Sequence, residues 1–330
     1  MGRYTIIKFK NLTPLHVGTG KENYDFSSSE LQSDTLSAAI AAIRAREGKT
    51  QDVEVFLRSF ALSSAFPFVG DRLFLPKPQG KIDIVVTDME EYSYRKKLKK
   101  IKYLESNLWN VVVSGKRLEV LSSQIKDDFL ISINNVDAFE KPYKTQVSQR
   151  VSVPREDNMP AEPFFFEWKY FNTDAGLFCI LDTSDDARRD EIVNLFGKLG
   201  EFGLGTDRNV GGGKFVVETK DWILNDVDNS DAKMLLSLYI PTEEELPALN
   251  LHESKYELLL RGGYISGSSE LEFSHLRKKS VYAFNVGSIF KTSIVPSGKI
   301  VNLKPEWKDE RMHSVYRSGK PFVVSVKFQA

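Results

Sequence analysis

The sequence predicts an α+β protein built from two ferredoxin-like domains, which are RRM-like units of the split βαβ type. Three observations support this fold class. Strand-like alternation is interleaved with amphipathic helical patterns in both halves of the chain, four prolines interrupt residues 140–163, and five glycines occupy residues 203–213. The 330 residues suffice for about two domains. We therefore expect an N-terminal domain over 1–140, a projecting segment over 141–163, and a C-terminal domain over 164–330.

The N-terminal elements follow from periodicity and capping residues. Apolar and polar residues alternate in Tyr4–Leu12, which predicts a half-buried strand. After a loop with glycines, Ser33 or Asp34 is the expected N-cap of a helix over Thr35–Arg44. Further elements are a second helix over Val53–Ala65, which ends before Phe66-Pro67, and a short strand over Arg72–Pro76.

The middle of the chain is basic and then irregular. Tyr92–Leu104 is a helix candidate in which six of thirteen residues are Lys or Arg. Such a run is either a solvated face or a surface for RNA or protein. Phe129–Val136 is a candidate strand. Residues 140–163 are mostly polar, and we expect them to form a long projecting loop or hairpin.

The C-terminal half repeats the alternation of strands and helices. Phe164–Phe171 and Gly176–Asp182 are expected to pair as strands, and Asp185–Leu199 has the apolar spacing of an amphipathic helix. Thr242 and Glu245 match a capping box of a helix that Pro247 keeps short. Further strands are expected at Lys214–Trp222, Met234–Ile240, Tyr256–Arg261, Tyr282–Phe290 and Phe322–Phe328.

Composition narrows the function classes. Lys and Arg together number 45, as do Asp and Glu, but residues 92–155 and 270–330 are basic and 156–269 are acidic. The single cysteine, Cys179, excludes a disulfide framework, and we expect it to be a buried, inert thiol. We expect neither a metal nor a cofactor. We also expect no membrane span, because no apolar run has the length of a span, and therefore a cytoplasmic location.

The glycine-rich loop is the most informative motif. Neither a Walker loop nor a Rossmann turn fits, because the loop runs from a helix to a strand. Its glycines would let backbone N–H groups approach a polyanion, and Arg208 and Lys214 place cations beside them. The alternative is a glycine-rich helix end that leads into a hairpin.

Few residues are candidates for catalysis. The four histidines match no zinc motif. His16 lies in a loop after the first strand, where it could act as a general acid–base, stack on a base, or hold the loop. Asp25 is interpreted as a solvated loop acid and Asp34 as a helix cap.

Four stretches resemble a known family. Phe202–Phe215 (FGLGTDRNVGGGKF) resembles the C-terminal glycine-rich loop of the RAMP superfamily of CRISPR RNA-binding proteins. Leu15–Gly20 with Ser33–Ile40, Leu62–Pro78 and Arg95–Tyr103 are similar to segments of the fourth subunit of the Csm effector, which is type III-A CRISPR. The matches lie between residues 15 and 215.

The resemblance implies a non-catalytic subunit that binds the 5′ tag of the CRISPR RNA in antiviral defence. It also implies docking to the Cas10-type large subunit and to the backbone RAMP subunit of the ribonucleoprotein. Carried onto this sequence, the RNA contacts fall in the first loop, in a protruding thumb hairpin within Lys141–Pro163, and in the glycine-rich loop: His16, Gly18, Gly20 and Lys21; Arg150 and Arg155; and Gly203, Gly205, Thr206, Asp207, Arg208, Asn209, Gly211, Gly212, Gly213 and Lys214.

Two alternatives stay open. One is a Cas6-like endoribonuclease that processes CRISPR RNA with His16 as its acid–base. The other is the equivalent tag-binding subunit of a type III-B or type I effector.

Overall fold

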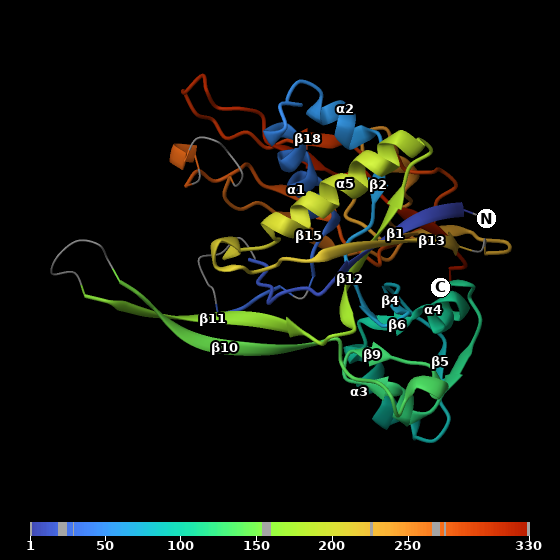
Figure 1. Ribbon diagram of the computed structural model, residues 1–330. Coiled ribbons are helices and arrows are strands. Elements are labelled where there is room, and N and C mark those ends of the chain that lie inside the picture. Colours follow the sequence, from blue (N-terminus) through green and yellow to red (C-terminus); the bar gives the residue numbers. More distant parts are fainter. Residues whose placement is uncertain are drawn as a thin grey trace.

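The computed structural model describes residues 2–18, 25–28, 30–153, 160–224, 227–265, 271–273 and 275–328. A large mixed sheet forms its centre, helices belong to the hydrophobic clusters on both of its faces, and a long hairpin projects from the body (Figure 1). The predicted α+β class is confirmed. Gly20, Lys21 and Arg155 lie outside the described residues.

The central sheet has the strand order β13-β1-β12-β3-β4-β6-β9-β8. Its long antiparallel strands are β1 (Gly2–Lys10), β12 (Ala175–Asp182) and β13 (Val216–Leu224). The shorter strands, with β2 paired to β12, are β2 (Ala61–Leu62), β3 (Phe66–Val69), β4 (Arg72–Pro76), β6 (Tyr103–Glu105), β8 (Ile125–Lys126) and β9 (Phe129–Leu130). The strand candidate at 129–136 is therefore confirmed only at its start.

Both faces of β12 are buried. Leu177, Cys179 and Leu181 pack in the cluster that contains α1 (Ser33–Arg46), α2 (Val53–Arg58) and α5 (Asp186–Phe202). Phe178 and Ile180 pack in a second cluster with the middle of the chain and the C-terminal strands. This explains why Gly176–Asp182 is almost uniformly apolar. Burial raises the pKa of the Cys179 thiol, as expected for an inert cysteine.

Strand pairing differs from the sequence prediction in two respects. Phe164–Phe171 does not pair with Gly176–Asp182, because β11 (Glu162–Phe171) pairs with β10 (Tyr143–Ser152), whereas β12 pairs with β1, β2 and β3. Moreover, β1 shares one sheet with β12 and β13, so the sheet crosses the boundary predicted at 141–163. Periodicity locates strands but does not choose their partners.

The middle of the chain folds as an insertion after β4. It contains α3 (Glu91–Lys100), α4 (Ser106–Val113) and the parallel pair of β5 (Ile84–Val86) and β7 (Leu118–Val120). The predicted basic helix ends four residues early, because the chain becomes extended at Ile101 and enters β6. The predicted second helix is likewise shorter, since residues 61–62 form β2.

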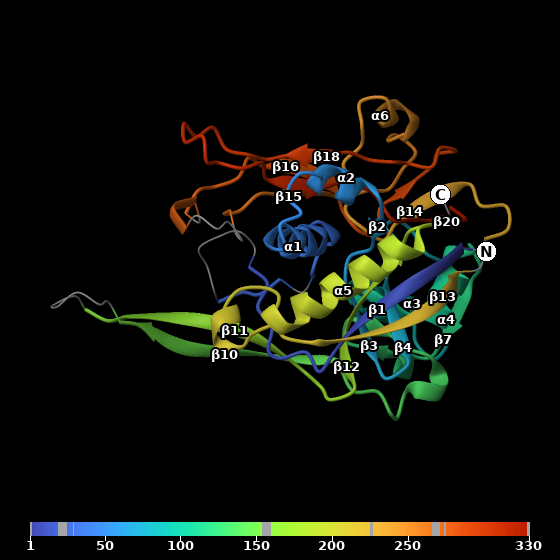
Figure 2. The ribbon, with the colours of Figure 1, turned by 45° about the horizontal axis from the view of Figure 1, so that its top comes forward.

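The C-terminal part consists mainly of short strands, at the top of Figure 2. Its sheets are β17-β14-β20, β15-β16 and β18-β19, formed by β14 (Ala232–Leu235), β15 (Leu258–Arg261), β16 (Val281–Phe284), β17 (Ile289–Phe290), β18 (Ile300–Asn302), β19 (Tyr316–Ser318) and β20 (Val323–Val326). In the described residues after 227, the α-helix is the four-residue α6 (Glu245–Ala248), with the predicted Thr242–Glu245 capping box. The strands β12 and β13, which lie within the unit predicted over 164–330, belong to the same sheet as β1.

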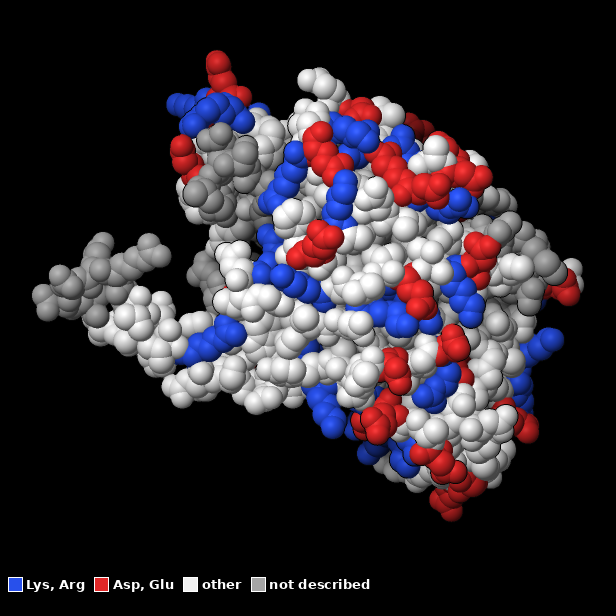
Figure 3. Space-filling view, in the orientation of Figure 1, with Lys and Arg blue, Asp and Glu red and all other residues white. Residues whose placement is uncertain are grey.

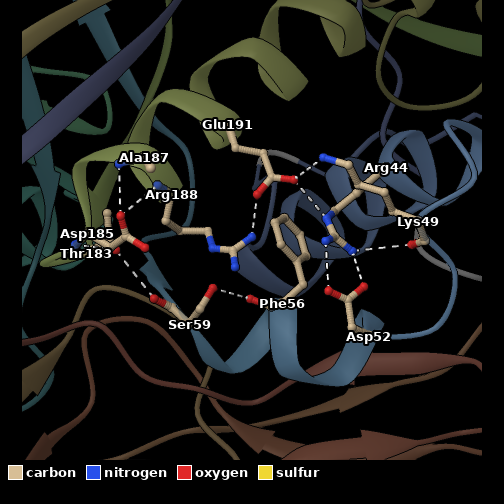
Figure 4. A network of polar contacts seen from close by, with 10 residues as sticks. All are labelled: Arg44, Lys49, Asp52, Phe56, Ser59, Thr183, Asp185, Ala187, Arg188 and Glu191. Carbon is tan, nitrogen blue, oxygen red and sulfur yellow. Dashed lines mark hydrogen bonds and ion pairs between the residues drawn. The ribbon is translucent and has the colours of Figure 1, made fainter.

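A polar network joins α1, α2 and α5 (Figure 4). The Arg44 guanidinium donates to Asp52 at 2.5 and 2.9 Å and to Glu191 at 3.0 Å, and it lies 4.7 Å from the centre of the Phe56 ring. Asp185 caps α5 by accepting from the amides of Ala187 and Arg188. This network fixes α5, whose C-terminal end leads into the glycine-rich loop.

Asp34 is not the predicted N-cap. The cap position is Gln32, and Asp34 is fully buried in the first turn of α1. Its carboxylate accepts from Arg261 at 2.9 and 3.0 Å and also pairs with Arg317. Asp34 therefore joins α1 to the C-terminal strands β15 and β19, which residue spacing could not reveal.

Candidate nucleic-acid interface

Three sequence-predicted segments meet at the base of the hairpin. The glycine-rich loop between α5 and β13 lies beside β10 and β11 (Figures 1 and 2). The Gly213 amide donates to the Pro14 carbonyl at 2.9 Å, and the Thr206 amide donates to that of His16 at 3.0 Å. Leu15 in turn exchanges two backbone hydrogen bonds with Lys169 of β11. The loop after β1 therefore links the hairpin to the glycine-rich loop.

Close packing explains most of the glycines. Gly203, Gly205 and Gly213 have φ values of 85°, 80° and 68°, and a Cβ on any of them would overlap a backbone carbonyl oxygen. A Cβ on Gly212 would lie 2.8 Å from the Trp168 indole. Gly211 alone of the five combines a positive φ with open space around its Cβ position.

Most backbone amides of the loop are already used. Thr13 Oγ1 accepts from Lys214 at 2.7 Å and donates to the Gly211 carbonyl at 2.8 Å. Backbone carbonyls accept from the amides of Gly203, Leu204, Thr206, Val210, Gly211, Gly212, Gly213 and Phe215. In the described part of the chain, only the loop amides of Gly205, Asp207, Arg208 and Asn209 have no acceptor. The loop therefore uses most of its amides in its own fold, and these four remain for the predicted contact with a polyanion.

Arg150 connects the hairpin to the loop instead of standing free. Its guanidinium pairs with the Asp207 carboxylate. Its central carbon lies 4.4 Å from the Phe166 ring centre and 5.3 Å from that of Trp168. Arg150 and Asp207 thus neutralise each other while the aromatic rings hold the arginine in place.

The His16 side chain is buried and is held in place by contacts with Glu167 and Phe166. Its Nδ1 lies 2.8 Å from the Glu167 carbonyl oxygen, to which it donates, and its ring centre is 4.4 Å from that of Phe166. A fully buried imidazole does not reach RNA at the surface, and the structural role weighed from the sequence fits these contacts. Gly18, next along the loop, lies close to Thr206: a Cβ there would be 3.6 Å from the Thr206 methyl.

The exposed cations of the site include one that the sequence did not indicate. Arg208, Asn209 and Lys214 are exposed, as predicted for contact residues. Arg46, at the end of α1, is also exposed, and its guanidinium lies 5.6 Å from the Phe202 ring centre. Partial burial and the charge of Arg46 lower the pKa of Arg208. Figure 3 shows Lys and Arg side chains along the part of the body next to the hairpin.

Two residues of the interface, Arg46 and Trp168, were not singled out from the sequence because their local sequence signals are weak. Arg46 and Arg208 are far apart in the chain, and only the packing of α1 against α5 brings their charges together. Trp168 appears in an aromatic strand whose pairing was predicted incorrectly.

Other chemistry has little support in the described residues. Within them, no group of three or more His, Cys, Asp or Glu side chains is arranged to hold a metal ion. None of the helices in that part of the chain combines the length and the apolar character that crossing a membrane requires.

Comparisons with known proteins give a consistent result. Residues 228–326 match the family described as the CRISPR Csm4 C-terminal domain. The chain is 24% identical over 264 residues to the CRISPR system Cms protein Csm4 of Thermococcus onnurineus (strain NA1), which covers 77% of this chain and 81% of that protein.

Two solved structures share the fold over nearly the whole chain. One is the Csm3–Csm4 subcomplex of the type III-A CRISPR-Cas interference complex, with a TM-score of 0.64, 19% identity, and coverage of 99% of this chain and 100% of that chain. The other is a Csm1–Csm4 cassette in complex with cA4, with a TM-score of 0.63, 20% identity and full coverage of both chains.

Proposed function

Because this chain belongs to the Csm4 family, we propose that it is the subunit of a type III-A effector that holds the 5′ tag of the CRISPR RNA without cleaving it. The observation that carries this proposal is the meeting of the first loop, the hairpin and the glycine-rich loop beside exposed cations. Backbone phosphates are bound by such cations, whereas base edges supply sequence information.

In this proposal the groups have different tasks. The glycines and Arg150 build a rigid junction between loop and hairpin. Arg208 and Lys214, joined by Arg46, supply charge on its surface. The open amides of residues 207–209 add donors next to Arg208. RNA would therefore be held mainly by side-chain cations on a preformed support.

The fold supports one ferredoxin-like unit with an insertion. The order β13-β1-β12-β3, with α1 after β1 and α5 between β12 and β13, is that of a split βαβ unit. The insertion runs from β4 to β11 and ends in the hairpin, which we propose as the counterpart of the thumb expected from the resemblance.

Docking to two protein neighbours is the second part of the proposal. The similar solved structures are a Csm1–Csm4 cassette and a Csm3–Csm4 subcomplex. By likeness, this chain would dock a large subunit of the Cas10 type and a backbone RAMP subunit. Co-purification of the tagged chain with both subunits, expressed together, tests this part.

RNA binding is tested by removing two exposed cations. Arg208→Ala combined with Lys214→Ala should weaken binding of a tagged guide RNA. It should also reduce the slope of log K against log salt by about 1.4, since each single-strand phosphate contact contributes about 0.7. The measurement is a fluorescence anisotropy titration at several salt concentrations.

The matched control is Lys116→Ala with Arg117→Ala, which removes the same charge from the exposed turn after α4, away from the hairpin (Figure 1). Equal loss of affinity in both double variants would overturn the assignment of the interface.

The proposed lack of catalysis is tested separately by incubating the protein with precursor RNA. Site-specific cleavage that His16→Ala abolishes would contradict it.

A further inference from the structure

A polar cleft of about 270 Å³ is lined by residues outside the glycine-rich loop. Its walls come from five parts of the chain: residues 30–32 before α1, residues 64–66 at the start of β3, residues 76–79 at the end of β4, residues 99–103 from the end of α3 to β6, and the residues just before β15 and just after β16. Three lysines and two glutamates line it: Lys77, Lys99, Lys102, Glu30 and Glu257. None of these residues belongs to the interface described above.

The lysines present positive charge to the cleft. Lys77 Nζ donates to the Leu98 carbonyl at 3.1 Å, and burial lowers the pKa of Lys77. Lys99 and Lys102 are exposed near the C-terminal end of α3. Among the described residues, neither Lys77 nor Lys99 forms an ion pair with a carboxylate.

The two carboxylates are held by neutral groups. Glu30 accepts from the Gln32 side-chain amide at 2.7 Å, and Glu257 accepts from that of Asn285 at 3.0 Å. Within the described ranges, no Lys or Arg forms an ion pair with either glutamate. In the described part of the chain, Lys77 and Lys99 thus line the same cavity as Glu30 and Glu257 without forming ion pairs with them. A ligand that fits both must carry an anionic group together with N–H donors.

We propose that this cleft binds a nucleotide whose base carries an amino group. The phosphate would lie against Lys99 and Lys102, and the exocyclic amine would donate to a carboxylate, as cytosine does to Glu or Asp. The rings of Phe66 and Tyr103 in the lining are buried and pack on Phe178 and Phe129, so the base would be recognised through its polar edge. The volume is close to the lower limit of ligand pockets, which suits one nucleotide.

The test is calorimetric titration of the full chain with AMP, CMP, GMP, UMP and inorganic phosphate. At least one amino-bearing nucleotide should bind about tenfold more tightly than UMP, whose 4-carbonyl would face a carboxylate, and than phosphate. Glu257→Gln or Glu30→Gln should remove that preference. If UMP and phosphate bind as well as the other three ligands, the proposal is overturned.

Charge variants separate a site from a diffuse basic surface. Lys99→Ala with Lys102→Ala should weaken binding about tenfold. Lys96→Ala with Lys97→Ala removes the same charge from α3 outside the cleft and should change binding less than about twofold. Equal effects of the two pairs would overturn the proposal. Circular dichroism and a melting curve check that each variant is folded.

A single-stranded RNA octamer identifies the source of the nucleotide. Tight binding of the octamer but not of mononucleotides, lost in Lys99→Ala with Lys102→Ala, would mean that the cleft takes one residue of a strand. Octamer binding that this pair leaves unchanged, without mononucleotide binding, would count against the cleft. Since the cleft shares no residue with the glycine-rich loop, either result leaves tag binding to be judged separately.

Discussion

Charges are handled differently in the helical network and at the glycine-rich loop, although Arg44 and Arg46 lie only two residues apart on α1. Arg44 is buried, hydrogen-bonded to Asp52 and Glu191, and these bonds raise its pKa. Arg46 is exposed and contributes to lowering the pKa of Arg208. Paired cations stabilise the fold, whereas neighbouring like charges favour binding of an anion.

The same contrast applies to the backbone. At the loop, close packing uses most of the amides internally, so the groups left for a ligand are chiefly side-chain cations. In the network, α5 is capped by Asp185 and its cations face carboxylates (Figure 4). Of these two regions, the glycine-rich loop has the surplus positive charge that RNA binding requires.

Asp34→Asn should give the largest effect on stability. The substitution leaves Arg261 and Arg317 largely buried without their carboxylate, which costs about 3–5 kcal/mol of unfolding free energy. Urea denaturation measures the change. A loss below about 1 kcal/mol would show that paired buried charges contribute little here.

Lys169 offers an intermediate case, a buried cation that forms no ion pair with a carboxylate among the described residues. Burial lowers its pKa to about 8 from an ordinary value of 10.5. Between these pH values the unfolded state binds more protons than the folded one, so stability should rise with pH, by at most about 3 kcal/mol. Urea denaturation of the wild type and of Lys169→Met over about three pH units, from about pH 7.5 to about pH 10.5, should show this rise only in the wild type. Parallel pH curves for the two proteins would contradict the assignment.

Gly213→Ala and Gly211→Ala test why the loop is rich in glycine. Both residues have a positive φ, but only at Gly213 would a Cβ overlap a carbonyl, that of Leu204. We expect losses of about 3 and about 1 kcal/mol, respectively, in thermal or urea unfolding. Equal losses would indicate that backbone conformation, not close packing, selects glycine.

Arg44→Ala and Arg46→Ala compare the two neighbouring arginines directly. Removing Arg44 breaks its hydrogen bonds to Asp52 and Glu191 and should cost about 2 kcal/mol, whereas removing Arg46 should change stability by less than about 0.5 kcal/mol. Only Arg46→Ala should weaken binding of tagged RNA in a folded protein. The reverse ranking in urea denaturation would invalidate the contrast between the two sites.

Local pattern was a good guide to individual elements. The spacing of Ile192, Leu195, Phe196 and Leu199 predicted the buried face of α5, and all four are buried. The position of the glycine-rich loop between a helix and a strand was also predicted correctly. Both features depend on residues close in sequence, where periodicity and turn chemistry act directly.

Pairing and burial of polar groups were not predictable in the same way. Asp34 has the sequence context of a cap, yet its partners are Arg261 and Arg317, more than two hundred residues away. The loop amides looked free because Pro14 and His16, which accept from them, lie in a separate segment. Long-range contacts of this kind have no local signature.

The sequence by itself determined the α+β class, most helices and strands, and the segments that concentrate glycine and charge, because these depend on side-chain chemistry within a few residues. The tertiary structure decided which strands share a sheet, which charges are paired and which amides remain open. Those outcomes depend on how distant segments pack, since a hydrogen bond or an ion pair forms only when folding brings both partners into contact.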